Sequence, residues 1–291
     1  MAATPRKQGV IMKLSDLSLH IRTIVRTALD EDIGTGDLTA QLIPEDSQAS
    51  ATVVTRNAMV LCGTLWFDEC FLTLDPNCKI TWLFKDGDIV DPGQEICKIE
   101  GNTRALLSAE RCALNFLQTL SATATVTRSY VEAIQGTDAK IMDTRKTLPG
   151  LRIAQKHAVK CGGGHNQRIG LFDGILIKEN HIIAAGGIAK ALDQARSTAP
   201  SDASIQIEVE SLDELRSALD GGAKLVLLDN FSLTDMRTAV EINQQRAELE
   251  ASGNVNLQTV HDIAKTGVNR ISIGSLTKDV SAIDLSMRIE R

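Results

Sequence analysis

One stretch of the chain, residues 205–230, decides the expected fold; it reads IQIEVESLDELRSALDGGAKLVLLDN. Two short apolar runs at 205–209 and 225–228 flank residues 211–220, which are long enough for one helix. A helix between two short strands carries the chain across the face of a sheet, so that the two strands pair in parallel. This stretch therefore predicts parallel β-structure with a helical crossover.

The same alternation continues on both sides. Further apolar runs lie at 140–142, 174–177, 247–251 and 270–273, and stretches long enough for one helix each lie at 151–160, 182–198, 232–245 and 256–266. Repeated alternation at this spacing is typical of a parallel sheet covered by helices. We therefore expect a β/α barrel, closed or nearly closed, with a doubly wound open sheet as the alternative.

The sequence before residue 105 lacks the regular alternation of strands and helices. Residues 19–29 show the apolar spacing of an amphipathic helix, and short strand-like runs follow at 50–63, 79–84 and 95–100. These strands are too close together for crossover helices, which predicts an α+β region. Residues 106–133 lack Gly and Pro and are long enough for two or more helices.

Composition narrows the function classes. The 291 residues include 31 Lys and Arg against 37 Asp and Glu, a net charge of −6, and only 3% are aromatic. A nucleic-acid binder usually has a basic excess and aromatic stacking residues, so that class is not expected. No apolar run reaches the roughly 18 residues of a membrane span, and residues 1–14 hold none of signal-peptide length. We therefore expect a cytoplasmic protein without nucleic-acid or membrane partners.

The cysteines are expected to be plain reduced thiols. They form no Cys-x-x-Cys pair, and none has a zinc-finger spacing to a histidine. A chain of this length needs no disulfide or metal to hold its core. The six are Cys62, Cys70, Cys78, Cys97, Cys112 and Cys161.

Polar residues of chemically active types follow each expected strand of the barrel. In β/α barrels the functional residues collect at the C-terminal ends of the strands. In chain order these ends hold Asp143, Thr144, Arg145 and Lys146; Lys178; Glu208 and Glu210; Asp229 and Asn230; residues 252–254; and Gly274 with Ser275. Each group alone is also compatible with a solvated turn, so the prediction rests on their combination.

That combination predicts an anion site. The cations expected to converge on the barrel mouth are Arg145, Lys146, Arg168 and Lys178. An arginine fork binds a carboxylate or phosphate bidentately, which suits a substrate with several anionic groups. Glu208 and Glu210, at i and i+2 of one strand, are expected on one face. Glu208 and Asp229 together with substrate phosphates would suit Mg²⁺, which predicts transfer chemistry on a phosphorylated substrate.

With these residues in view, the chain resembles a known family. From about residue 19 to the C-terminus it is similar to quinolinate phosphoribosyltransferase, the decarboxylating nicotinate-nucleotide pyrophosphorylase. The resemblance is carried by collinear segments: ALDEDIGTGDLT at 28–39, AER at 109–111, LNFLQ at 114–118, DTRKTLPGLR at 143–152, GGG at 162–164, IKENH at 177–181, EVE at 208–210, LDN at 228–230 and SGN at 252–254.

The resemblance implies a fold and a reaction. The fold is α/β, with an N-terminal α/β sandwich domain of residues 1–107, completed by 278–291, and an incomplete β/α barrel of residues 108–277. The reaction joins quinolinate to phosphoribosyl pyrophosphate and gives nicotinate mononucleotide, pyrophosphate and CO₂ in de novo NAD biosynthesis, with Mg²⁺. A homodimer, or a hexamer built from dimers, is also implied.

Residue roles follow from the resemblance too. Arg145, Arg168 and Lys178 match the residues that hold the quinolinate carboxylates, and Lys146 matches one close to the phosphates. Arg104 matches an arginine that reaches into the neighbouring subunit's site. The candidates for catalysis are Lys146, Lys178, Glu208 and Asp229, the last two also holding Mg²⁺ through water. The candidates for the 5′-phosphate are Ser252, Gly253, Asn254, Gly274 and Ser275.

One position departs from the family pattern. Gln167 stands where the family often has a histidine that contributes to the dicarboxylate site. Its amide keeps a hydrogen-bond donor but carries no charge. Whether Gln167 or the nearby His165 takes this role is left open.

Three other functions remain as alternatives. A related phosphoribosyltransferase would act on another pyridine-like acid and would change the Arg145, Arg168 and Lys178 set. An aldolase on a β/α barrel would use Lys178 as a Schiff-base nucleophile. A binding protein without catalysis would have no use for carboxylates facing a cationic loop.

Overall fold

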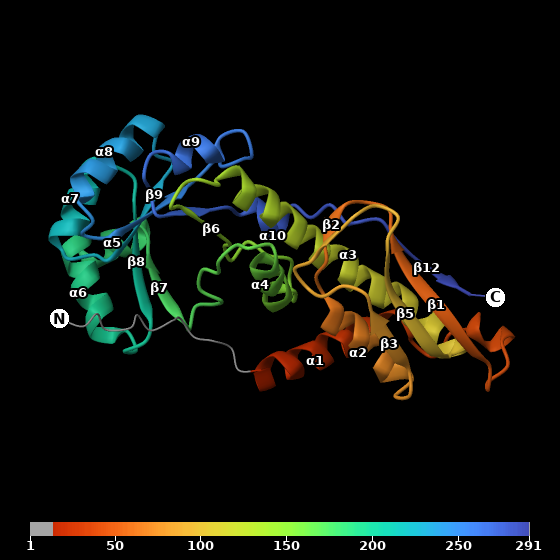
Figure 1. Ribbon diagram of the computed structural model, residues 1–291. Helices are drawn as coiled ribbons and strands as arrows, with labels where there is room; N and C mark the ends of the chain where they lie inside the picture. The colour runs from red at the N-terminus through yellow and green to blue at the C-terminus, as the bar shows by residue number, and fades with distance from the viewer. Residues whose placement is uncertain (1–13, 291) are drawn as a thin grey trace, which may run out of the picture. The chain divides into compact units, whose positions relative to one another are not determined.

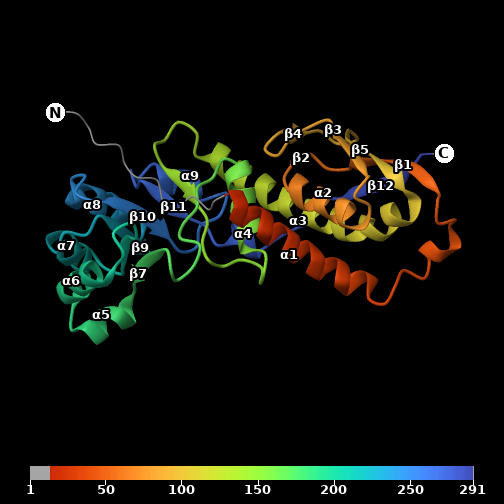
Figure 2. The ribbon, with the colours of Figure 1, turned by 90° about the horizontal axis from the view of Figure 1, so that it is seen from below.

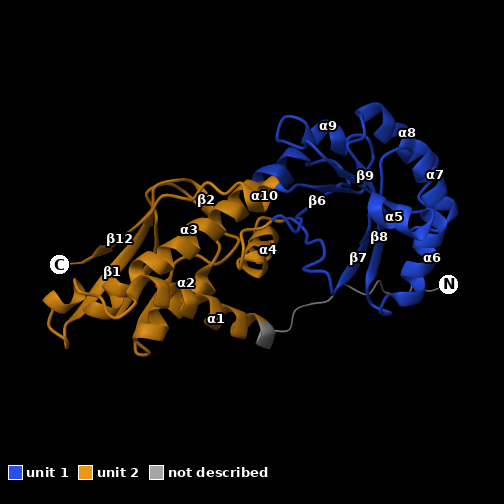
Figure 3. Cartoon of the chain, turned by 180° about the vertical axis from the view of Figure 1, so that it is seen from behind, with its two compact units in different colours: residues 1–12, 129–146, 164–274 blue, residues 13–128, 147–163, 275–291 orange. Residues whose placement is uncertain are grey.

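The computed structural model describes residues 14–290 and divides into two compact units (Figures 1 and 3). The barrel unit holds Ser129–Lys146 and Gly164–Gly274, and the N-terminal unit holds 14–128, 147–163 and 275–290. The domain limits expected from the sequence stay a prediction beside this division. Most of residues 1–14, in which no signal segment is expected, lie outside the described residues. Within the described part, no helix is both long and apolar enough to cross a membrane.

The barrel unit is built on a six-stranded parallel sheet. Its strands are β6 (Lys140–Met142), β7 (Gly174–Ile177), β8 (Ser204–Val209), β9 (Leu225–Asp229), β10 (Glu248–Ser252) and β11 (Arg270–Ser272). Their order is β6-β11-β10-β9-β8-β7, with β6 and β7 as the two edges. The sheet does not close between these edges, which confirms the α/β class and the incomplete barrel.

Helices cover the outer face of this sheet (Figure 2). They are α5 (Glu179–Ala185), α6 (Ile188–Thr198), α7 (Leu212–Asp220), α8 (Leu233–Asn243) and α9 (Val260–Ala264). The stretch 182–198, expected to form one helix, is divided between α5 and α6. The break falls at Gly186 and Gly187, whose φ angles of 81° and 124° lie outside the helical region.

The N-terminal unit contains several helices and a four-stranded antiparallel sheet. The sheet has the order β12-β1-β5-β3, from β12 (Leu285–Ile289), β1 (Gln48–Thr55), β5 (Glu95–Asn102) and β3 (Lys79–Trp82). A separate pair joins β2 (Met59–Val60) and β4 (Ile89–Val90). Strand β12 thus brings the C-terminal segment of the chain to the edge of the N-terminal sheet.

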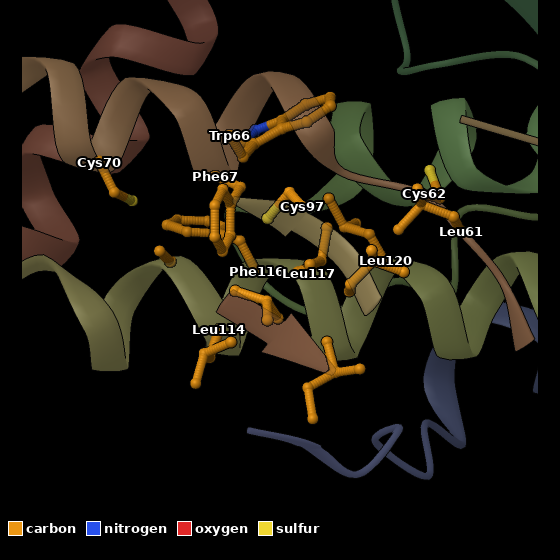
Figure 4. Close-up of a cluster of buried hydrophobic side chains, with 14 of the residues drawn as sticks. Leu61, Cys62, Trp66, Phe67, Cys70, Cys97, Leu114, Phe116, Leu117 and Leu120 are labelled. Carbon is orange, nitrogen blue, oxygen red and sulfur yellow. The ribbon is translucent and has the colours of Figure 1, made fainter. Parts of the chain in front are cut away.

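The helices of this unit supply many of the side chains of its apolar core (Figure 4). They are α1 (Leu14–Ile33), the 3₁₀ helix η1 (Ala40–Leu42), α2 (Thr64–Leu74), α3 (Thr103–Ala133, whose last residues belong to the barrel unit), α4 (Arg152–Cys161) and α10 (Ser275–Lys278). Trp66 and Phe67 of α2 pack with Leu117 and Leu120 of α3, and all four are fully buried. The region 106–133 is one continuous helix rather than two or more, since it contains no helix-breaking residue.

Candidate active site

Two predicted site residues form an ion pair at the end of β7 and β8. Parallel pairing aligns Ile177 with Ile207, so the next residues, Lys178 and Glu208, are neighbours. The Lys178 Nζ lies 2.9 Å and 3.1 Å from the two carboxylate oxygens of Glu208. The side chain of Glu208 is only 11% exposed, whereas that of Lys178 is 45% exposed. A largely buried carboxylate is thereby paired with a cation that still reaches solvent.

The second acidic candidate lies on the same face of the sheet. Glu208 is in register with Leu227, two residues before Asp229, so Glu208 and Asp229 project from one face of adjacent strands. Asp229 is in turn opposite Ser252 on β10. The strand register therefore brings Glu208, Asp229 and Ser252 to one edge of the barrel, as the sequence predicted.

The loops after β9 and β10 interlock closely. Gly253 has a φ of 101°, and a Cβ atom built there would lie 2.1 Å from Oδ1 of Asn230. Only glycine fits this approach. Asn254 donates from Nδ2 to the same Oδ1 at 3.4 Å, and Asn230 donates from Nδ2 to Asp229 at 2.8 Å. Asn230 thus links the carboxylate of Asp229 to the loop 252–254.

Lys146 and Gly274 meet at the next strand end. A Cβ atom on Gly274 would lie 2.9 Å from Cδ of Lys146, so the lysine stem passes directly over this glycine. The Lys146 amide donates to Oγ1 of Thr144 at 3.0 Å, which turns the chain after β6. Ser275, the residue that follows Gly274, begins α10 in the N-terminal unit.

The predicted Arg168 lies close enough to the positive charge of Arg145 for that charge to act on it. Burial, and next the positive charge of Arg145, lower the pKa of Arg168 below its ordinary value. The Arg168 guanidinium donates from Nη1 to the carbonyl of Gly174 at 2.8 Å. Asp173 shapes the intervening loop by accepting the amides of Ile169 and Gly170. Neighbouring guanidinium groups of this kind attract an anion that carries more than one negative charge.

A buried polar network lies behind this loop. Asp143, fully buried at the end of β6, accepts the amide of Gln167 at 2.8 Å and Nδ2 of Asn166 at 2.6 Å. Gln167 donates from Nε2 to the carboxylate of Glu250, and Gln206 donates to Oε2 of Glu250 at 3.1 Å. Glu250 is 1% exposed, and its burial raises its pKa. Asp143 and Glu250 thus fix both ends of Gln167.

The structure corrects one expectation about a neighbouring residue and bears on the open choice between Gln167 and His165. Glu210 lies one residue beyond the end of β8, is exposed, and donates its backbone amide to Glu214, so it does not share the inward face of Glu208. The second inward carboxylate belongs to Glu250 instead. His165 forms an isolated parallel bridge with Met142 beside β6 and is exposed, whereas the side chain of Gln167 contacts Glu250.

Arg104 lies in the other unit, near the start of α3. Its Nε donates to the carbonyl of Ile43 at 2.7 Å, which holds the guanidinium beside the segment that follows η1. Its expected role in a neighbouring subunit stays a prediction.

The acidic pair fits the expected Mg²⁺ in one respect. Glu208 and Asp229 offer carboxylate oxygens from one face of adjacent strands, which is the ligand type Mg²⁺ prefers. Among the described residues they belong to no group of three or more convergent metal-ligating side chains. Two carboxylates suit an ion that takes its remaining ligands from water and substrate phosphates.

Four polar residues of the site received no role from sequence reasoning. Asp143 and Asn230 were expected at strand ends but were given no part in binding or catalysis. Gln206 and Glu250 lie inside short strands whose sequence is mostly apolar. One signal was present: Glu250 and Ser252 alternate on β10, so an acidic residue shares the face of a predicted site residue. That alternation could have predicted an inward carboxylate.

Comparison with protein families matches both parts of the chain. The C-terminal domain of quinolinate phosphoribosyl transferase matches residues 123–288, and the N-terminal domain matches residues 37–121. Together the two matches span most of the chain.

Individual relatives agree with these matches. The chain is 40% identical over 271 residues to a probable nicotinate-nucleotide pyrophosphorylase [carboxylating] of Bacillus subtilis (strain 168), covering 93% of this chain and 94% of the relative. It is 39% identical over 290 residues to the chloroplastic nicotinate-nucleotide pyrophosphorylase [carboxylating] of Arabidopsis thaliana, covering 93% and 83%. A solved nicotinate-nucleotide pyrophosphorylase from Francisella tularensis superposes with a TM-score of 0.91 at 48% identity, covering 94% of this chain and 97% of the other.

Proposed function

The chain belongs to the quinolinate phosphoribosyltransferase family, and we propose that it transfers the phosphoribosyl group of phosphoribosyl pyrophosphate to quinolinate. The products are nicotinate mononucleotide, pyrophosphate and CO₂, and the step belongs to NAD biosynthesis. The relatives that carry this activity in their names share about 40% of their residues with this chain over nearly its whole length.

One observation from the structure carries the substrate assignment. Arg145 lies close enough to Arg168 to lower the pKa of the Arg168 guanidinium, and Lys178 stands at the end of β7 in the same unit. Two neighbouring guanidinium groups repel each other unless an anion lies between them. A pyridine with two carboxylates supplies such an anion and leaves its ring nitrogen free to react.

The first chemical step needs no nucleophile from the protein. The pyridine nitrogen attacks the anomeric carbon, and the electron pair of the breaking carbon–oxygen bond leaves with pyrophosphate. Arg145, Arg168 and Lys178 would hold the two carboxylates, and Lys146 the phosphates, so that the reacting atoms are aligned. Glu208 and Asp229 would stabilise the positive charge that develops on the ribose.

The second step removes the 2-carboxylate as CO₂. The electrons of the broken carbon–carbon bond stay on the ring carbon beside the new pyridinium nitrogen, and a proton then replaces the lost group. Because the pyridinium is itself the electron sink, no Schiff base and no organic cofactor are required. The buried network of Asp143, Gln167 and Glu250 would keep the loop that carries Arg168 in position.

Mg²⁺ belongs to the proposal through Glu208 and Asp229. When bound, it would neutralise negative charge on the pyrophosphate group. Lys178 already offsets the charge of Glu208, so we expect the ion to be held with substrate phosphates rather than by the protein alone.

A product assay tests this function. The protein is mixed with Mg²⁺, phosphoribosyl pyrophosphate and quinolinate, and pyrophosphate release is followed. Nicotinate in place of quinolinate is the control, because it lacks the carboxylate that the reaction removes. Release with quinolinate and not with nicotinate supports the proposal; release with nicotinate alone assigns the protein to a related phosphoribosyltransferase.

We further propose that the active protein is a homodimer, or a hexamer of dimers, and that Arg104 acts in the neighbouring subunit's site. Arg104→Ala and Lys178→Ala subunits, each inactive alone, should regain roughly a quarter of the wild-type activity when mixed at random, because half of the dimers are hybrids and each has one intact site. Hybrids of demonstrated composition without activity would contradict site sharing.

The aldolase alternative is disfavoured by the Lys178–Glu208 pair. A Schiff-base nucleophile must be free to attack a carbonyl carbon, whereas the Lys178 Nζ is held by both carboxylate oxygens of Glu208. Borohydride trapping with a carbonyl substrate would detect that chemistry. A cytoplasmic location remains part of the proposal and can be checked by cell fractionation.

A further inference from the structure

A second group of reactive side chains lies in the N-terminal unit, apart from the residues assigned to substrate. Cys62, Asp86, His157 and Cys161 each offer one ligand atom, and these four atoms lie within 4.8 Å of one another. They come from three separate segments: the loop between β2 and α2, the loop between β3 and β4, and helix α4. We call this group the α4 cluster.

Helix α4 supplies two of the four ligand atoms. His157 and Cys161 stand at i and i+4, so both side chains lie on one face of the helix. The Sγ of Cys161 lies 3.5 Å from Nε2 of His157. Two ligands four residues apart on a helix are a recurrent way of holding zinc, because one helical turn sets their separation.

The other two ligands are held by contacts with the backbone. Oδ1 of Asp86 accepts the amides of Gly63 at 3.1 Å and Thr64 at 3.2 Å, so the carboxylate is fixed at the start of α2. The backbone of Cys62 is held on both sides by Ser121, which accepts its amide at 3.0 Å and donates to its carbonyl at 3.1 Å. Outer contacts of this kind orient metal ligands before the metal binds.

Three of the six separations within the α4 cluster are close to the edges of a coordination tetrahedron. Zinc bonds of about 2.3 Å to sulfur and 2.0–2.2 Å to nitrogen or oxygen place tetrahedral ligand atoms roughly 3.3–3.8 Å apart. The observed separations are 3.0 Å between Nε2 of His157 and Oδ2 of Asp86, and 3.9 Å between Oδ2 of Asp86 and Sγ of Cys62. With the 3.5 Å contact above, three edges fall within a few tenths of an ångström of this range.

The α4 cluster is largely buried, as a structural metal site is, but it keeps enough solvent exposure for an ion to reach it. Cys62 is fully buried at the end of the apolar core (Figure 4). The side chains of Asp86 and His157 are 16% and 30% exposed. Two thiolates, an imidazole and a carboxylate are a donor set that selects zinc over Mg²⁺ or Ca²⁺.

We propose that Cys62, Asp86, His157 and Cys161 bind one Zn²⁺ as a four-ligand structural site. When the ion binds, the two thiols release their protons to solvent. The ion ties α4 to the two loops that hold Cys62 and Asp86. Four protein ligands leave no open position, so the site stabilises the N-terminal unit and takes no part in the reaction.

Metal binding by the reduced full-length chain is the test. The protein is treated with reductant and chelator, both are removed, and Co²⁺ is added as a spectroscopic probe, followed by Zn²⁺. The expected results are about one metal ion per chain by elemental analysis, and a cobalt–thiolate charge-transfer band that Zn²⁺ abolishes. The midpoint of thermal unfolding should also rise with Zn²⁺.

Variants identify the ligands. Cys161→Ser and His157→Gln should each weaken metal binding more than tenfold, since removing even an outer partner costs that much. Cys112→Ser is the matched control, because Cys112 is buried in the same unit outside the cluster. Circular dichroism checks that each variant folds.

The proposal is wrong if the reduced wild-type chain shows no cobalt–thiolate band. It is also wrong if Cys112→Ser and Cys161→Ser lose metal affinity equally. A Cys62–Cys161 disulfide whose reduction restores no metal binding would contradict it as well. The wild-type spectrum decides the matter even if a ligand variant does not fold. Metal content is measured without substrates, so the result is independent of the proposed reaction.

Discussion

The barrel unit and the N-terminal unit bury different kinds of side chains. Both buried carboxylates among the residues whose burial is described, Asp143 and Glu250, belong to the barrel unit. The largest fully buried side chains are Trp66, Phe67 and Phe71, all in the N-terminal unit. A buried carboxylate costs free energy unless it is hydrogen-bonded, whereas an apolar ring gains free energy on burial. The barrel unit therefore holds polar groups in place for chemistry, and the N-terminal unit contributes apolar stability.

The largest expected effect comes from the barrel mouth. Arg145→Ala should lower kcat/KM by about 2–5 kcal/mol, or roughly 30- to 5,000-fold, because a charged hydrogen-bond partner of the substrate is removed. The midpoint of thermal unfolding should stay close to wild type. Arg216→Ala is the control, since Arg216 is an exposed arginine of the same unit paired with Asp213. Near-normal turnover by Arg145→Ala would contradict a role for Arg145 in substrate binding.

The N-terminal core should show the opposite behaviour. Leu117→Ala should lower the free energy of unfolding by about 2–5 kcal/mol, because Leu117 is fully buried and the surrounding core refills the space only in part. Urea denaturation measures this change. Leu257→Ala, at a residue that is 44% exposed, should stay within about 0.5 kcal/mol of wild type. Equal effects at the two positions would contradict the assignment of stability to this core.

The strand-end residues of the site were predicted from the sequence, whereas the buried network and the α4 cluster were not. Lys178, Glu208 and Asp229 were expected together because functional residues gather at the C-terminal ends of parallel strands. Lys178 follows β7, Asp229 ends β9, and Glu208 is the last residue but one of β8. Glu250 lies inside the five-residue strand β10, and its alternation with Ser252 was the one signal of an inward carboxylate. Only His157 and Cys161 of the α4 cluster have a local spacing typical of metal ligands. Cys62 and Asp86 come from segments far from them in the sequence, up to 99 positions away, so no spacing joins all four.

The exact ends of the helices were also not predicted from the sequence. The length of the stretches 182–198 and 106–133, and the lack of Gly and Pro in the second, predicted helical structure. Neither feature predicted the break at Gly186 and Gly187 or the single continuous helix α3. The helix expected at 151–160 forms as α4, yet its contacts assign it to the N-terminal unit rather than the barrel. Tertiary contacts, which local pattern does not contain, decide these points.

Glu250 offers a pH test of the barrel unit. Burial raises the pKa of Glu250 above its ordinary value of 4.5, so the folded protein binds its proton more tightly than the unfolded chain does. The stability from this group is fully present below about pH 4.5 and is lost as the pH rises through the raised native pKa. Glu250→Gln should remove this part of the pH dependence in urea denaturation measured across that window. An unchanged pH profile would contradict the burial argument.

The smallest expected effect concerns Gln167. Because its Nε2 donates to Glu250, a histidine can replace it and still donate to the same carboxylate. Gln167→His should therefore change kcat/KM by less than about tenfold, or 1.4 kcal/mol. Gln167→Ala, which leaves the buried carboxylate with one donor fewer, should be worse in both activity and unfolding free energy. Equal behaviour of the two variants would show that the contact with Glu250 is unimportant.

The most direct measurement follows the fate of the 2-carboxylate. Quinolinate labelled at that carbon is incubated with the protein, phosphoribosyl pyrophosphate and Mg²⁺, and labelled CO₂ and pyrophosphate are counted together. Transfer with decarboxylation predicts one labelled CO₂ for each pyrophosphate, with both lost in Arg145→Ala. Pyrophosphate released without labelled CO₂, or no release of either product by the folded wild-type protein, would contradict the account.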